Sequence, residues 1–141
     1  MTVTPNKVVR QRIAEIMLET NDPHLFSIAV RAVPQADASL AFQQTNELIE
    51  VLRRDHGQES WSLDLVFESL CDTFPNRCAG FFAEFLHSAT TQEAIELCFA
   101  LRYTDTDVPV GSILAPLLKD ERTTDYWSEP VRLRDFAARQ A

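Results

Sequence analysis

The sequence predicts an all-α protein with a single domain over residues 1–141. Apolar residues recur at helical spacing along most of the chain, and no segment of several residues alternates in the manner of a strand. The chain has only three glycines, so a sheet-rich fold with many tight turns is disfavoured. The seven prolines lie almost entirely between the apolar-periodic segments, where they separate helices. We therefore expect seven or eight antiparallel helices joined by short turns.

The N-terminal part of the chain predicts three helices. The first begins at Thr4-Pro5, where a capping residue precedes a proline at the first helical position. Asn21-Asp22-Pro23 ends this helix and caps the second, which ends at Pro34. A third helix is expected from about residue 37 or 39 to about residue 54. Its inward stripe contains Thr45, Leu48, Ile49 and Leu52.

The remaining helices are predicted from similar stripes and breaks. The fourth begins near residue 59 or 60 and is broken by Pro75-Asn76. Its stripe contains Leu63, Val66, Phe67, Leu70, Cys71 and Phe74. The fifth follows from Cys78, and Thr90 or Thr91 caps the sixth, with Glu93 near its N-terminal dipole. A seventh carries Val110, Ile113, Leu114 and Leu117, and an eighth is expected to start around Ser128-Glu129-Pro130.

The C-terminal segment has the plan of a helical repeat, in which ILAPLLKDER is followed by VRLRDFAARQA. The matching positions are Leu114, Pro116, Leu117, Leu118 and Asp120, then Val131, Arg132, Ala137 and Ala138. This pair resembles a HEAT-like repeat, although the turn from Glu121 to Glu129 is longer than in that family. The resemblance implies an α-solenoid that binds another macromolecule. A compact helical bundle with one repeat-like corner is the alternative.

The net charge of −8 is concentrated in the middle of the chain. The stretch from Asp55 to Asp107 holds ten acidic residues, opposed only by Arg77 and Arg102. This balance disfavours nucleic-acid binding, which requires clustered Lys and Arg residues. An acidic surface attracts a basic protein partner, whereas the alternative is that the carboxylates only solvate outer helix faces.

Targeting and cysteine patterns point to the cytoplasm. No apolar run approaches the roughly 20 residues that span a bilayer, and MTVTPNKVVRQR lacks the apolar region of a secretory signal. We therefore expect a cytoplasmic protein without a membrane segment. Cys71, Cys78 and Cys98 form no CxxC pair, so we expect small buried side chains and no disulfide or zinc site.

No sequence motif identifies a reaction. The chain contains no GxSxG, glycine-rich phosphate loop or HExxH motif. Glu84 and His87 have the spacing of one half of a di-iron site, but the chain has no second such pair. We therefore expect no catalytic residue, no cofactor and no metal. A helical enzyme or ligand-binding protein that uses Glu84 and His87 remains the alternative.

These observations predict a non-enzymatic protein–protein interaction module. Within that class, we expect an immunity-type protein that neutralises a basic bacterial toxin through an acidic helical surface. The predicted partner-binding residues are five acidic and three aromatic ones: Asp64, Glu68, Asp72, Glu93, Glu96, Trp61, Tyr126 and Trp127. The aromatic residues are candidate anchors, although Tyr126 and Trp127 could instead pack between the last two helices. A HEAT-like scaffold or regulatory subunit without a toxin partner is the other possibility.

Overall fold

The computed structural model describes residues 8, 9, 12, 16, 18–56, 62–102, 108–126 and 129–140. Helices dominate this part of the chain, so the predicted all-α class is confirmed. The helices are α2 (Pro23–Arg31), α3 (Ala38–His56), α4 (Leu63–Thr73), α5 (Cys78–Ser88), α6 (Thr91–Arg102), α7 (Val110–Leu114) and α8 (Leu133–Gln140). Short 3-10 helices cover Gln35–Asp37 and Ala115–Lys119. Most of the predicted first helix lies outside the described residues.

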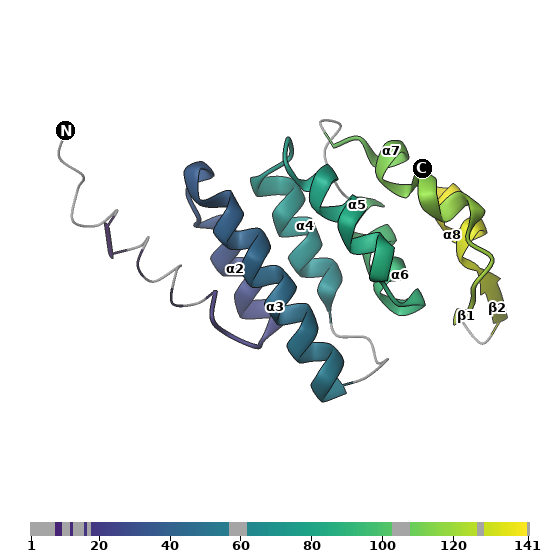
Figure 1. The fold of residues 1–141 in the computed structure, drawn as a ribbon, viewed down its shortest axis with the longest axis horizontal. Helices are drawn as coiled ribbons and strands as arrows, with labels where there is room; N and C mark the ends of the chain where they lie inside the picture. The colour runs from purple at the N-terminus through teal and green to yellow at the C-terminus, as the bar shows by residue number, and fades with distance from the viewer. Residues whose placement is uncertain are drawn as a thin grey trace.

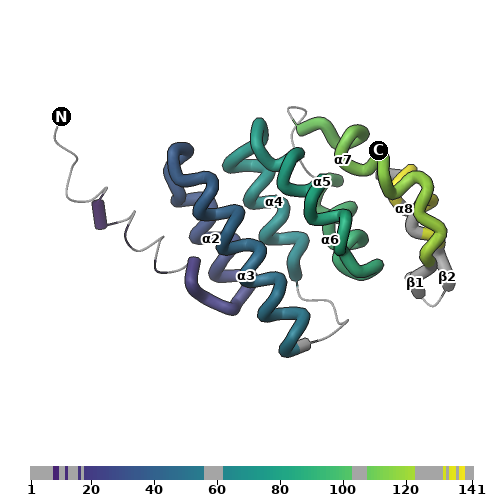
Figure 2. The backbone as a smooth tube through the Cα atoms, viewed as in Figure 1, coloured from purple at the N-terminus to yellow at the C-terminus, as the bar shows by residue number. Residues whose placement is uncertain are grey.

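The helices stack side by side in two rows (Figure 1). In one row, α4 lies between α2 and α6, and α6 packs in turn against α8. The other row contains α3, α5 and α7: the ring of Phe42 on α3 lies 4.9 Å from that of Phe81 on α5, and α5 packs against α7. Successive helices therefore alternate between the rows as the chain advances (Figure 2).

Aromatic and aliphatic side chains fill the space between the rows. The ring of Phe67 on α4 lies 5.4 Å from that of Phe82 and 5.0 Å from that of Phe85, both on α5. Such edge-on ring contacts add to the stabilisation that comes from burying the rings. The predicted inward stripe of α4 is fully buried, as is that of α3: Leu63, Val66, Phe67, Leu70, Cys71, Phe74, Thr45, Leu48, Ile49 and Leu52.

The start of α2 follows the predicted capping residues, whereas α4 starts at Leu63 and not near residue 59 or 60 as predicted. The side chain of Asp22 accepts a hydrogen bond of 2.9 Å from the backbone N–H of His24, and Pro23 occupies the first turn of α2. This arrangement satisfies one of the unpaired N–H groups at the helix start and uses proline where its missing N–H costs nothing.

The C-terminal segment differs from its prediction. The elongated turn predicted from Glu121 to Glu129 is instead largely an antiparallel pair of short strands, β1 (Thr123–Tyr126) and β2 (Glu129–Arg132). The prediction that the last helix starts around Ser128-Glu129-Pro130 is therefore wrong, and α8 starts at Leu133. The threonines of β1 and Val131 of β2 favour extended backbone because they are β-branched. The predicted seventh helix continues as a 3-10 turn where Pro116 removes a backbone donor.

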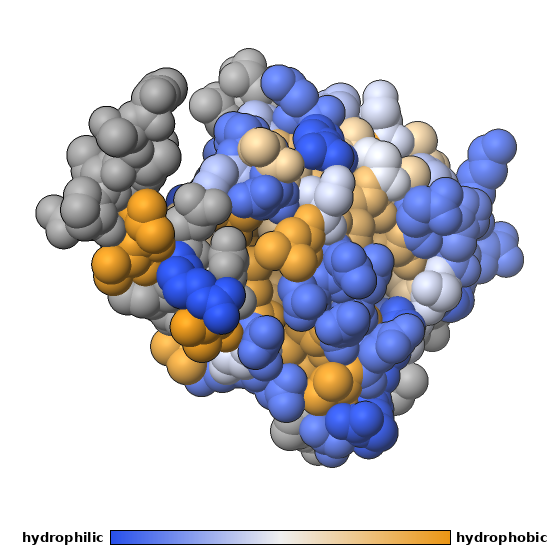
Figure 3. All heavy atoms as spheres, turned by 60° about the vertical axis from the view of Figure 1, so that its left-hand side comes forward, coloured by the Kyte–Doolittle hydropathy of each residue, from blue (hydrophilic) through white to orange (hydrophobic). Residues whose placement is uncertain are grey.

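The end of the stack formed by the first described helices exposes apolar side chains. Figure 3 shows this end, with apolar groups set among polar ones. Leu25 and Ile28 on α2 retain 44% and 60% of their exposure, and Leu40 on α3 is also exposed. Within the described residues, no helix has the length and apolar character required to cross a membrane.

Candidate functional site

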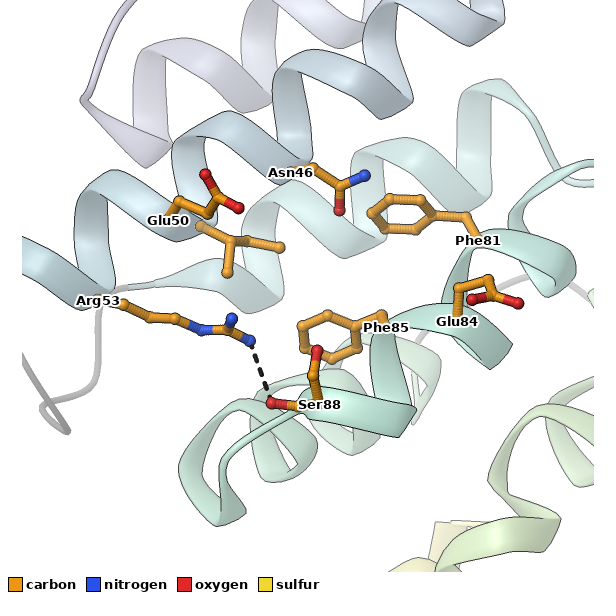
Figure 4. Close-up of a pocket in the computed structure, with 8 residues that line it drawn as sticks. Asn46, Glu50, Arg53, Phe81, Glu84, Phe85 and Ser88 are labelled. Carbon is orange, nitrogen blue, oxygen red and sulfur yellow. Dashed lines mark hydrogen bonds between the residues drawn. The ribbon is translucent and has the colours of Figure 1, made fainter.

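A groove runs between α3 and α5, which are neighbours in the same row (Figure 4). Its volume is about 250 Å³. It is lined by Asn46, Ile49, Glu50 and Arg53 from α3, and by Phe81, Glu84, Phe85 and Ser88 from α5. On each helix these residues recur every three or four positions, so they share the face that meets the neighbouring helix.

The groove combines an apolar floor with acidic walls. Ile49 and Phe85 are buried and Phe81 is half-buried, so their side chains form a largely dry surface at its base. Glu50 stands on the α3 side and Glu84 on the α5 side, both exposed. Neither forms an ion pair with another described residue. Both carboxylates therefore stay available to a ligand at the mouth of the groove.

Arg53 closes one end of the groove, and its charge is already compensated. Its Nε donates a hydrogen bond of 2.7 Å to Glu93 Oε2, and its Nη2 donates to the other carboxylate oxygen of Glu93. Nη2 also reaches the carbonyl oxygen of Ser88 at 3.4 Å. The hydrogen bond to Glu93 raises the pKa of Arg53 above its ordinary value, and Glu50 adds a weaker attraction. The net charge at the groove is therefore set by Glu50 and Glu84.

Glu93 was predicted to contact a partner, but it lies inside the fold with 1% of its surface exposed. Its carboxylate accepts the backbone N–H of Thr90 at 3.2 Å, while Thr90 Oγ1 accepts the backbone N–H of Glu93 at 3.2 Å. This reciprocal pair is a capping box, which satisfies two N–H groups at the start of α6. Glu93 thus caps α6 and holds Arg53, and it does not belong to the acidic surface.

Glu96, also predicted as a partner contact, is likewise buried, with 4% of its surface exposed. Its Oε2 accepts the backbone N–H of Asp64 at 3.1 Å, at the start of α4. Ser62, the residue before α4, has a left-handed backbone with φ of 64° and makes no side-chain capping bond. Glu96 therefore supplies from α6 the anionic cap that the start of α4 lacks.

The other predicted acidic residues lie along α4. Asp64 and Glu68 are half-buried and Asp72 is exposed, and their spacing of four residues places them on one side of the helix. Arg31 on α2 donates a hydrogen bond of 2.9 Å to Asp72 and neutralises part of this column. Because α4 belongs to the other row, the column and the groove are separate surfaces. We call Asp64, Glu68 and Asp72 the α4 column below.

The three predicted aromatic anchors remain predictions. Trp61 and Trp127 lie outside the described residues. Tyr126 is the last residue of β1, where its backbone pairs with Glu129. Its side chain is not among those described.

The histidine and cysteine side chains were the other candidates for chemistry. Glu84 and His87 are both exposed on α5, and the described residues contain no group of three or more metal-ligating side chains. The three cysteines are buried, as predicted, and burial raises the pKa of Cys98 to about 12. A hydrogen bond with Cys78 and burial both raise the pKa of Cys71. The thiols of Cys71 and Cys98 are therefore poor nucleophiles at neutral pH, whereas the hydrogen bond with Cys71 lowers the pKa of the buried Cys78.

Two residues that shape the groove, Glu50 and Arg53, were missed by the sequence reasoning. The stripe of α3 indicated which residues face inward, but it did not indicate that α3 and α5 would be neighbours. The sequence did contain a signal for the role of Glu93. The Thr90-x-x-Glu93 spacing is typical of a capping box, which predicts that the Glu93 carboxylate binds a backbone N–H at the start of the helix.

The fold and the groove define a class: a predominantly helical protein whose helices alternate between two rows and border an acidic groove. Comparison with known proteins found no matching family model, no matching curated protein and no matching solved structure.

Proposed function

We propose that this protein is a non-enzymatic interaction module that binds a basic protein partner through its acidic surfaces. The observation that carries the proposal is a set of carboxylates, Glu50, Glu84 and Glu68, that form no ion pair with another described residue. In a chain with net charge −8, carboxylates left without internal partners attract cations and steer cationic proteins.

The helix arrangement supports a HEAT-like solenoid as the scaffold for this activity. In such proteins each helix pair packs on the next, and helices of the same kind line up in one row. The alternation of α2, α4, α6 and α8 with α3, α5 and α7 follows the same plan. A row of helices offers an extended face, which suits a macromolecular partner better than a small molecule.

Within this class we propose a cytoplasmic, immunity-type role, in which the protein masks a cationic site of a bacterial toxin. The support is the combination of a net negative charge with the acidic groove and the α4 column at the surface. A scaffold or regulatory subunit with the same binding surface is the alternative, and the nature of the captured partner distinguishes the two.

The test is capture of partners by the tagged full chain from cells of its source, followed by mass spectrometry. The expected partner is basic, and its complex weakens as salt rises because exposed charge pairs are screened beyond about 8 Å at physiological ionic strength. A captured toxin whose growth inhibition is relieved by co-expression of this chain supports the immunity role. A captured basic protein without toxicity supports the scaffold alternative.

Three variants locate the binding surface. One carries Asp64→Lys with Glu68→Lys on the α4 column, and one carries Glu50→Lys with Glu84→Lys in the groove. The matched control carries Glu121→Lys with Asp135→Lys, which makes the same charge change at exposed residues near α8. We expect one or both of the first two to lose the partner while the control retains it. An acidic partner, or equal binding by all three variants, contradicts the proposal.

A further inference from the structure

We propose that the groove between α3 and α5 binds a single lysine or arginine side chain presented by the protein partner. This inference rests on the proposed function and assigns to that function a particular recognition site. It commits to one occupant, a cationic side chain, on the basis of the shape, floor and charge of the groove.

The size of the groove suits one side chain. Its volume of about 250 Å³ is below the range of about 300–1,000 Å³ that is usual for small-molecule pockets. A long side chain that enters from a protein surface needs less room, because the backbone to which it is attached stays outside.

The floor suits the stem of a lysine or arginine. Phe81 and Phe85 turn their rings toward the groove (Figure 4), and the buried side chain of Ile49 adds aliphatic surface to its lining. The methylene stems of lysine and arginine pack on apolar surface while the charged group stays near water. A guanidinium or ammonium near the face of a phenylalanine ring gains further attraction from the ring electrons.

The walls select a cation. Glu50 and Glu84 border the groove from opposite helices and lie toward opposite ends of it (Figure 4), so a positive group in the groove is attracted by a carboxylate at each end. Arg53, the one cation among the described residues that line the groove, is already held by both oxygens of Glu93, so its charge is largely compensated. An anionic occupant would therefore be repelled by two exposed carboxylates, whereas a cationic one would be attracted by them.

The test is a nuclear magnetic resonance titration of the ¹⁵N-labelled full chain with N-acetyl-arginine amide and N-acetyl-lysine amide. In these probes the side chain carries the only charge. We expect backbone amide shifts concentrated in the residues that line the groove. N-acetyl-citrulline amide, a neutral probe of nearly the same shape as the arginine probe, should bind about tenfold more weakly, since it lacks charge-assisted bonds.

Matched variants tie the binding to the two carboxylates. Glu50→Gln with Glu84→Gln should weaken the binding of the arginine probe about tenfold, whereas Asp64→Asn with Glu68→Gln, an equal charge change on the α4 column, should alter it less than about twofold. Circular dichroism of both variants checks that the fold is retained. Equal binding of the neutral probe, shifts centred outside the groove, or equal effects of the two variant pairs would overturn the inference.

The two proposals can fail separately. Suppose that a basic partner is captured and is lost when the charges of the α4 column are reversed, while the arginine probe causes no amide shifts in the groove. The proposed function then stands and the groove site is wrong. If the probe binds the groove but the captured partner is acidic, the groove site stands and the proposed function is wrong.

Discussion

Helix α6 and the groove between α3 and α5 both contain a pair of glutamates, but the two pairs have different roles. Glu93 and Glu96 are buried and each accepts backbone N–H groups at a helix start. Glu50 and Glu84 are exposed and have no ion pair with another described residue. A carboxylate with internal donors stabilises the fold, whereas one without them contributes little to stability and remains available for binding.

The largest expected effect on stability comes from removing the buried carboxylate of α6 with Glu93→Ala. The change removes the capping box and leaves Arg53 without its carboxylate. Since the side chain of Arg53 is 32% exposed, water compensates part of the lost pair, and we expect a loss of about 2–3 kcal/mol in the free energy of unfolding. Urea denaturation followed by far-UV circular dichroism measures it.

The matched control is Glu50→Ala, one turn before Arg53 on α3. Because Glu50 is exposed and forms no ion pair with another described residue, we expect a change below about 0.5 kcal/mol in the same assay. Equal losses for the two variants would mean that the two glutamates contribute equally to stability, and the distinction between the two pairs would fail.

The same comparison explains how far the sequence predicted the site. Helical spacing predicted the buried stripes of α3 and α4, because burial of a helix face is encoded in local periodicity. The hydrogen bonds between Glu93 and Thr90 were predictable from the sequence, since the two residues are only three positions apart. The hydrogen bond of Glu96 was not predictable, because its donor lies at the start of α4 and the contact requires α4 and α6 to be neighbours.

The groove and the hairpin were missed for related reasons. Glu50 and Glu84 come from helices separated in the sequence by α4, so their presence in one groove depends on the alternation of helices between rows. Helical periodicity predicted a turn and a helix start in the segment that forms β1 and β2. The extended preference of the threonines and the pairing of Thr124 with Val131 prevail there instead.

A smaller effect is expected at a third internally paired carboxylate, Asp120, which precedes β1. Arg122 donates to both of its oxygens and also donates to the carbonyl oxygen of Ala89 at 2.9 Å. The hydrogen bond with Arg122 lowers the pKa of Asp120 below its ordinary value. The pair therefore stabilises the fold above the unfolded-state pKa of about 3.9, and this contribution is lost as the pH falls through the lower folded-state pKa.

Asp120→Asn tests this dependence. Because much of the Arg122 side chain is exposed, solvent screening limits the pair, and we expect a loss of about 0.5–1 kcal/mol at pH 7. The difference between variant and parent should shrink as the pH falls below about 4. A difference that stays constant down to the acid transition would show that the Asp120 charge is not what stabilises this turn.

The smallest effect is expected for the groove itself. Glu50→Gln with Glu84→Gln reduces the net charge from −8 to −6 without removing an ion pair among the described residues. We expect the free energy of unfolding to change by less than about 0.5 kcal/mol. Any increase should occur only at low salt, where the repulsion between like charges is screened least.

The corresponding α6 double variant, Glu93→Gln with Glu96→Gln, should lose stability under the same conditions, because two buried acceptors of backbone or guanidinium N–H groups lose their charge. A loss above about 1 kcal/mol in the groove variant would show that Glu50 and Glu84 are structural after all. If instead the groove variant is as stable as the parent but loses its cationic ligand, binding and folding have been assigned to different glutamates of the same fold. Carboxylates that the fold does not need, placed beside an aromatic floor, are what a site for a cationic side chain requires.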